Sequence, residues 1–217
     1  EENKLKGKYK HEKFAKHLAF TKNYLYSLII KSQAAYISER SVDSRIQLMI
    51  TECKILFSKA LFGQYFRAIR KAKVFFLKHE RFGYYLQLLD MEKVIIKKEE
   101  LQTEKSEQLY KEAAGTLEKI KNMFDYSILG SRVLLSYREF GTSRGGKQDK
   151  EMEEIATNPL VKDIGLALSL RAKESFYRLQ ELINNTSGDY DKSLAALEMR
   201  RKIVIENPEP FRDYIID

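Results

Sequence analysis

The residues whose spacing comes closest to a ligand-binding motif lie in the polar segment 141–148. Gly141 to Lys147 fits Gly-x-x-x-x-Gly-Lys, the core of a phosphate-binding loop. In such a loop, backbone N–H groups at the start of a helix hold phosphates and a serine or threonine hydroxyl holds magnesium. Gln148 stands at the hydroxyl position, and the residues before Gly141 have helical rather than strand periodicity. We therefore interpret 141–148 as a polar loop and expect no nucleotide or other cofactor.

Side chains that could bind a metal or act as a nucleophile are few and poorly placed. His11 and His17 are six positions apart, so they lie on opposite sides of a helix. Cys53 is the only cysteine, which excludes a disulfide and a cysteine-based zinc site. The Glu-x-x-His spacing of di-iron helical bundles does not occur. The sequence therefore predicts no metal site, and we expect the protein not to be an enzyme.

Basic residues are the most prominent polar feature of the sequence. The formal net charge is +8, and no acidic residue lies between Glu52 and Glu80. A basic surface of this kind can meet nucleic acid, an anionic membrane or an acidic protein. We expect an acidic protein or peptide partner, with nucleic acid as the alternative, and a merely solvated face stays open. The candidate binding patch consists of Arg67, Arg70, Lys71, Lys73 and Lys78.

The elements that must position these side chains are predicted to be helices throughout. Only three prolines and ten glycines occur, whereas a β-protein needs turn residues about every 8–12 positions. Apolar residues recur at helical spacing along nearly the whole chain. The sequence therefore predicts an all-α protein. The expected helices cover 9–39, 43–61, 65–79, a segment after Gly83 that reaches Lys98, 103–139, 150–156, 161–184 and 189–206.

Two details of these helices can be predicted from residue type. Gly63 separates the second helix from the third and is expected to take the left-handed conformation that ends a helix, and Phe82-Gly83 breaks the pattern again. In the segment 103–139 the helical spacing continues without proline, which predicts one long helix or two helices joined near Gly130. The residues that carry this pattern are Leu109, Ala113, Leu117, Ile120, Phe124, Ser127, Ser131 and Leu134.

One helical turn resembles a known repeat family. The segment Gly188-Asp189-Tyr190-Asp191-Lys192-Ser193-Leu194 is similar to the turn between the two helices of a tetratricopeptide repeat. Gly63 to Ile69 repeats that pattern, and Phe82-Gly83-Tyr84-Tyr85 echoes it more weakly. The turns at Gly63 and Gly188 are not separated by a multiple of the family's period of about 34 residues. The chain therefore resembles a degenerate tetratricopeptide-like α-solenoid, in the style of uncharacterised bacterial helical-repeat proteins.

This resemblance implies stacked antiparallel helical hairpins and no activity or site residues. Stacked hairpins create extended surfaces that other proteins occupy. We therefore expect a non-enzymatic protein-interaction or scaffold domain.

The ends and the domain organisation give the remaining expectations. We expect a single helical domain over 1–217, with a subdivision, if any, near 141–148. The chain begins with Glu1-Glu2, so we expect it to be part of a longer protein. No segment reaches the length of a membrane span, and the single cysteine fits a reducing, cytoplasmic compartment. Phe211, Tyr214 and Ile215 lie at helical spacing after Pro210, which predicts an apolar C-terminal end. We expect neighbouring helices, a second copy of the chain or downstream sequence to cover it, and hence self-association through this end or a gain in stability on extension.

Overall fold

The computed structural model describes residues 7–12, 14, 17–38, 41–96, 103–140 and 147–212, and these contain helices and turns but no strand. The prediction of an all-α protein is therefore confirmed. The chain divides into two compact units, residues 1–48 and 49–217. The division falls within helix α4 (Val42–Ser58), and the subdivision suggested near 141–148 stays a prediction. Residues 141–146 lie outside the described part of the chain.

The first unit contains one long helix, α3, over Leu18–Ser38. The helix predicted from Tyr9 therefore begins nine residues later, and residues 9–11 form a turn. Apolar side chains occur on all sides of α3, and Phe20, Tyr26 and Ile29 are each more than half exposed. Helices that are apolar all round are normally covered by other elements.

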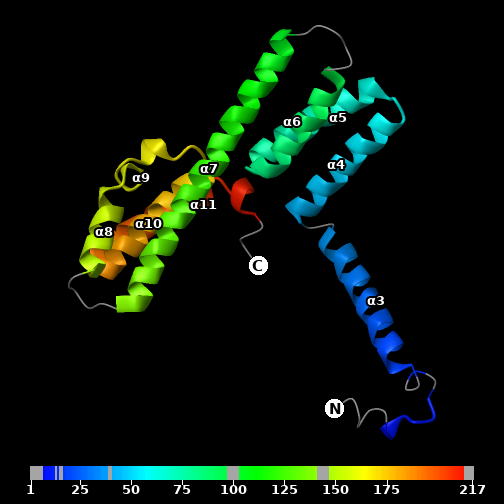
Figure 1. The fold of residues 1–217 in the computed structure, drawn as a ribbon, viewed down its shortest axis with the longest axis horizontal. Coiled ribbons are helices and arrows are strands. Elements are labelled where there is room, and N and C mark those ends of the chain that lie inside the picture. The colour runs from blue at the N-terminus through cyan, green and yellow to red at the C-terminus, as the bar shows by residue number, and fades with distance from the viewer. Residues whose placement is uncertain are drawn as a thin grey trace. The chain divides into compact units, whose positions relative to one another are not determined.

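The second unit is an array of helices around α7, which runs uninterrupted from Thr103 to Phe140 (Figure 1). Helix α6 packs against α7, and so do α8 and α10. Polar contacts place α6 beside the first part of α7 and α8 beside its last part, because Tyr85 bonds Glu112 and Arg132 bonds Glu151. The other elements of this unit are α5 (Phe62–Lys78), α6 (Phe82–Ile96), α8 (Lys147–Thr157), α9 (Pro159–Lys162), the 3-10 turn η1 (Ile164–Leu166), α10 (Leu170–Ser187), α11 (Tyr190–Glu206) and the 3-10 turn η2 (Glu209–Phe211).

The turns between α4, α5 and α6 occur where predicted, but glycine does not make them. The left-handed residues are Ala60 and Glu80, with φ of 55° and 49°. In the first turn the amide of Leu61 donates to the carbonyl of Leu56. In the second turn the amide of Arg81 donates to the carbonyl of Phe76 in the same way. Such bonds satisfy carbonyls at a helix end. Gly63 and Gly83 lie in the first turn of the following helix instead, so the predicted role of Gly63 is wrong.

The turn between α10 and α11 follows its prediction. Gly188 has a φ of 80°, and the amide of Asp189 donates to the carbonyl of Asn184 over 2.9 Å. The Asp189 side chain then caps α11 by accepting a hydrogen bond from the Lys192 amide. Helix α11 ends at Glu206, as expected.

The helix predicted over 161–184 is broken into three pieces. Asp163 ends α9, and its side chain accepts a hydrogen bond from the Gly165 amide. Asn122 of α7 holds the following segment through two bonds of 3.0 Å, to the carbonyl of Leu166 and from the amide of Leu168. Helix α10 begins only after Ser169, whose hydroxyl caps it. Tertiary hydrogen bonds therefore override the helical periodicity of this segment.

The core lies between the second part of α7 and the elements α8, α9 and α10. It is built from Tyr126, Leu129, Val133, Ile155, Val161, Ala167, Ala172, Phe176 and Leu179. Of the two forms predicted for this segment, the single long helix is the one found. Its helical pattern does not mark the buried side, because Leu117 and Phe124 are 55% and 65% exposed. Helix α7 carries apolar residues on two opposite faces, and periodicity alone does not say which face is buried.

The C-terminal segment folds back onto the second unit. Turn η2 packs against α10, and Phe211 is buried. The ring nitrogen Nδ1 of His79 lies 2.8 Å from the carbonyl of Glu209, and Lys78 forms an ion pair with the Glu209 carboxylate at 2.7 Å. The apolar end predicted at Phe211 is therefore covered by this chain. Tyr214 and Ile215 lie outside the described residues.

Candidate binding groove

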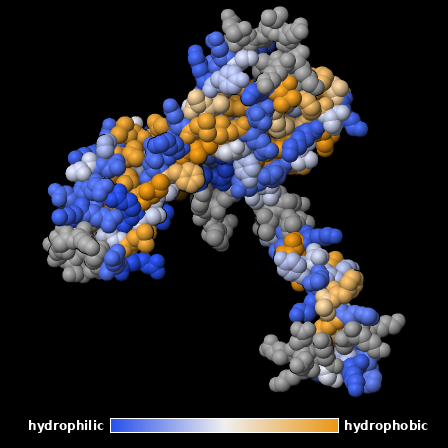
Figure 2. Space-filling view, in the orientation of Figure 1, coloured by the Kyte–Doolittle hydropathy of each residue, from blue (hydrophilic) through white to orange (hydrophobic). Residues whose placement is uncertain are grey.

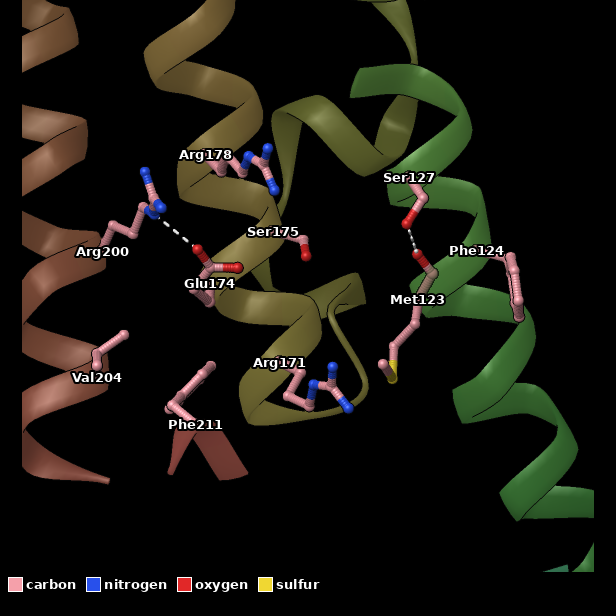
Figure 3. A pocket seen from close by; sticks show the side chains of 10 residues that line it. All are labelled: Met123, Phe124, Ser127, Arg171, Glu174, Ser175, Arg178, Arg200, Val204 and Phe211. Carbon is pink, nitrogen blue, oxygen red and sulfur yellow. Dashed lines mark hydrogen bonds and ion pairs between the residues drawn. The ribbon is translucent and has the colours of Figure 1, made fainter. Parts of the chain in front are cut away.

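Three hollows of the second unit lie beside helix α10. One has a volume of about 490 Å³ and is bounded by α7, α10, α11 and η2 (Figure 3). Its lining residues are Met123, Phe124, Ser127, Arg171, Glu174, Ser175, Arg178, Arg200, Val204 and Phe211. We call this hollow the α10 groove. Three arginines and one glutamate line it, so its charge is positive.

The start of α10 is fixed by a residue from a distant part of the sequence. Glu80 is buried, and its two carboxylate oxygens accept hydrogen bonds from the amides of Leu170 and Arg171 at 2.7 and 2.8 Å. The hydroxyl of Ser169 accepts from the Ala172 amide at 3.1 Å. A carboxylate at a helix N-terminus is favoured both by these N–H groups and by the helix dipole. These bonds hold the first turn of α10, and with it Arg171, beside the groove.

The three arginines of the groove differ in their partners. Arg200 bonds Glu174 at 2.6 Å and Glu181 at 2.8 Å. Partial burial by itself would lower the pKa of Arg200, but these two carboxylates outweigh it and raise the pKa. Arg178 is exposed, and no described acidic side chain lies within ion-pair distance of it. Figure 3 shows Arg171 and Arg178 extending from α10 toward the side of α7. Arg178 therefore presents a guanidinium whose charge is not neutralised by described acidic residues.

A second hollow continues the groove past the start of α10. It has a volume of about 490 Å³ and shares Met123, Phe124 and Arg171 with the first. Its other lining residues come from the α5–α6 turn, α6 and α7: Glu80, Arg81, Phe82, Gly83, Tyr84, Gln87 and Ile120. The two hollows together form a continuous surface with an exposed aromatic ring, Phe124, at their junction.

A smaller hollow of about 180 Å³ opens where Arg178 faces α7. Small residues such as Gly130, Ser131 and Ser175 line it together with Tyr126 and three leucines. A Cβ added at Gly130 would meet nothing within 4 Å, which confirms open space at this position. The hydroxyls of Ser131 and Ser175 make no hydrogen bond to the described residues. Arg178 and two hydroxyls thus surround a space large enough for a carboxylate group.

The predicted basic patch is divided by the structure. Lys73 is half-buried and forms ion pairs with Glu92 at 2.7 Å and Glu112 at 3.0 Å. Tyr85 donates its phenolic hydrogen to Glu112 over 3.0 Å. This cluster joins α5, α6 and α7. Lys73 is therefore held in ion pairs between helices and is not part of an exposed binding surface.

The other four members of the patch lie on the outer side of α5. Lys78 is exposed but is paired with Glu209. Arg67, Arg70 and Lys71 are exposed on one face with Val74, and none has an acidic partner among the described residues. The structure thus places three of the five predicted residues on one exposed face, where no described acidic side chain neutralises their charge.

The described residues contain few groups for other chemistry. No group of three His, Cys, Asp or Glu side chains in this part of the chain could hold a metal ion. Burial, and next the charge of Glu52, raise the pKa of the Cys53 thiol to about 11, so it is a poor nucleophile. None of the described helices is both long and apolar enough to cross a membrane.

Sequence reasoning missed the α10 groove. Arg171, Glu174, Ser175 and Arg178 lie at helical spacing and form the polar face of α10. This signal was available, but any surface helix has a polar face. The groove exists only because α7 and α11 flank α10 on both sides, and that arrangement depends on contacts between distant segments.

Comparison with known proteins gives no match: no family model, no curated protein and no solved structure is significantly similar to the chain.

Proposed function

We propose that the second unit binds an acidic segment of another protein in the α10 groove. The observation that carries this proposal is Arg178, an exposed guanidinium without an acidic partner among the described residues, at the edge of two hollows. Arginine is favoured at protein interfaces because its planar guanidinium pairs with carboxylates in two-point contacts. The role is one of recognition and scaffolding, and it requires no catalytic residue.

The apolar part of the groove supports a peptide rather than a small anion. Phe124 is 65% exposed beside Met123, and both belong to the two large hollows. Exposed aromatic residues beside an arginine are typical anchors of protein interfaces. A ligand with one acidic side chain near an apolar side chain would satisfy Arg178 and cover Phe124 at the same time.

The test is a titration with a fluorescent peptide that alternates glutamate and leucine. Binding should weaken about tenfold or more in Arg178→Glu, because a like charge then meets the ligand. Arg201→Glu is the matched control, since Arg201 is an exposed arginine on α11 that does not line the groove. Equal losses in the two variants would show only a general effect of net charge and would contradict the groove.

A second candidate function is nucleic-acid binding by α5. The observation that favours it is the exposed face of Arg67, Arg70 and Lys71, whose cations lack acidic partners among the described residues. Phosphate contacts release counterions, so such binding weakens steeply with salt. Lys78 should be left unchanged in the test, because it is paired with Glu209.

The combined variant Arg67→Glu, Arg70→Glu, Lys71→Glu should abolish binding to a single-stranded oligonucleotide while the melting temperature changes little. The measurement is fluorescence anisotropy at two salt concentrations. Binding that survives both charge reversal and added salt would mean that this face is only solvated.

A further inference from the structure

Helix α7 presents an apolar stripe on the face opposite its core residues. Tyr110, Leu117, Phe124, Ile128 and Leu135 are 53%, 55%, 65%, 57% and 61% exposed. Their spacings of seven, seven, four and seven place them on one line along a helix. Figure 2 shows apolar surface along the second half of α7 on the face turned to the viewer. The described residues of this chain leave the stripe open to solvent.

The stripe has the spacing of a coiled-coil seam. Together with Ala114, Lys121 and Ser131 it advances by alternating steps of four and three residues from Tyr110 to Leu135. This heptad spacing lets side chains of two helices interlock along a seam. The seam extends over ~38 Å of helix at 1.5 Å per residue. Its natural partner is therefore another long helix.

We propose that the seam pairs with α7 of a second copy of this chain, in antiparallel orientation about a two-fold axis near Tyr126. The self-paired part of the seam runs from Leu117 to Leu135, because α7 ends at Phe140 and leaves Tyr110 without an opposite position. Within this part the side chains follow the order apolar, Lys121, apolar, apolar, Ser131, apolar. Reversal of one helix places Leu117 against the partner's Leu135 and Phe124 against the partner's Ile128. Lys121 then faces the partner's Ser131. The seam is thus complementary to itself, as a two-fold interface requires.

Charges beside the seam support the antiparallel orientation. In this register Lys111 lies next to the partner's Glu139. Glu118 lies next to the partner's Arg132, which within its own chain also pairs with Glu151 and Glu154. Asp125 lies next to Asp125 of the second copy. The repulsion between these two carboxylates is reduced because each is paired with Lys121 of its own chain at 2.8 Å. A parallel pair in register would instead place Lys121 against the partner's Lys121 within the seam. Opposite charges beside a seam set partner choice and orientation.

Sedimentation equilibrium of the full chain tests the interface. We expect a concentration-dependent mass that rises from the 25.5 kDa of one chain toward twice that value. Leu117→Glu should weaken the association by about tenfold or more, because it removes apolar burial from the seam. Leu194→Glu is the matched control, since Leu194 is 57% exposed on α11. Phe124 belongs both to the seam and to the α10 groove, so pairing of two chains covers part of the groove, whereas Leu117 does not line it. Peptide binding should therefore be retained or tightened in Leu117→Glu, because less of the protein is paired.

A strict monomer at all soluble concentrations would overturn the proposal. So would an equal loss of association in Leu117→Glu and Leu194→Glu, with unchanged helical content in both.

Cysteine pairing tests the register. The double variant Lys121→Cys, Ser131→Cys should form covalent dimers under mild oxidation, because the two positions face each other across the two-fold axis. Disulfides need Cα atoms about 4.4–6.8 Å apart, and positions 121 of the two copies would be much farther apart than that. Each single variant should therefore stay uncrosslinked, and Cys53 is buried and should not interfere. Rapid crosslinking of either single variant would contradict the antiparallel register.

Discussion

Glu80 occupies a left-handed backbone position, and its carboxylate caps α10 from 90 positions away in the sequence. A non-glycine residue pays about 1 kcal/mol or more for this conformation. Ala60 occupies the equivalent turn, and no hydrogen bond from its side chain compensates, because alanine has no polar group. The two positions therefore share the same strain but differ in what the side chain contributes.

Substitution by glycine should separate these two effects. Ala60→Gly should raise the free energy of unfolding by about 0.5–1 kcal/mol, because strain is relieved. Glu80→Gly should lower it by about 1–2 kcal/mol, since two buried amides lose a charged acceptor. Urea denaturation of the two variants measures both values. Stabilisation of similar size at both positions would show that the Glu80 cap contributes nothing.

Cys53 provides a second test at the residue scale. Its side chain is fully buried, and its pKa is raised to about 11, chiefly by burial. Thiolate is the reactive form, so a thiol reagent at neutral pH should label the native protein very slowly and the urea-unfolded protein rapidly. Fast labelling of the native chain would mean that α4 opens readily around Cys53.

The cluster of Lys73, Glu92, Glu112 and Tyr85 acts at the scale of elements, because it joins α5, α6 and α7. Burial by itself would raise the pKa of Glu112, but the hydrogen bond and charge of Lys73, with help from Tyr85, outweigh it and hold the pKa below its usual range. A carboxylate with a lowered pKa stabilises the fold above its unfolded pKa, and this stabilisation is lost as the pH falls through the folded pKa.

Glu112→Gln should therefore lower the free energy of unfolding at pH 7 by about 1 kcal/mol, allowing for the partial exposure of this cluster. The difference between the variant and the wild type should shrink as the pH falls below about 4. Urea denaturation at several pH values measures both quantities. A difference that is independent of pH would show that Glu112 acts through packing and not through its charge.

The sequence predicted the elements better than their contacts. Caps and turns such as Asp189 and Gly188 act locally, so their residue types revealed α11 and its start. The helical pattern of α7 did not reveal its buried face, because Leu117 and Phe124 belong to a second apolar stripe opposite Leu129 and Val133. The break before α10 depends on Asn122, which is more than 40 positions away. Residues whose role arises from distant contacts carry no local signal.

For the whole molecule, we propose that recognition takes place in the α10 groove. The predicted patch on α5 and the groove found in the structure both carry exposed arginines, so a net-charge effect alone cannot distinguish them. Arg178 lines the same hollow as Phe124 and a smaller one with the hydroxyls of Ser131 and Ser175, whereas Arg67 and Arg70 lie with Val74 on the exposed face of α5. We therefore expect a peptide that carries a glutamate next to an apolar side chain to bind more tightly at Arg178 than at the α5 face.

The most direct measurement is a nuclear magnetic resonance titration that follows the side-chain Nε–Hε signals of the arginines. With the glutamate–leucine peptide, the signals of Arg171 and Arg178 should shift in a saturable way, and those of Arg67 and Arg70 should not. Arg200 should move less, since Glu174 and Glu181 already engage it. Shifts confined to Arg67 and Arg70, with the groove arginines unmoved, would contradict the account.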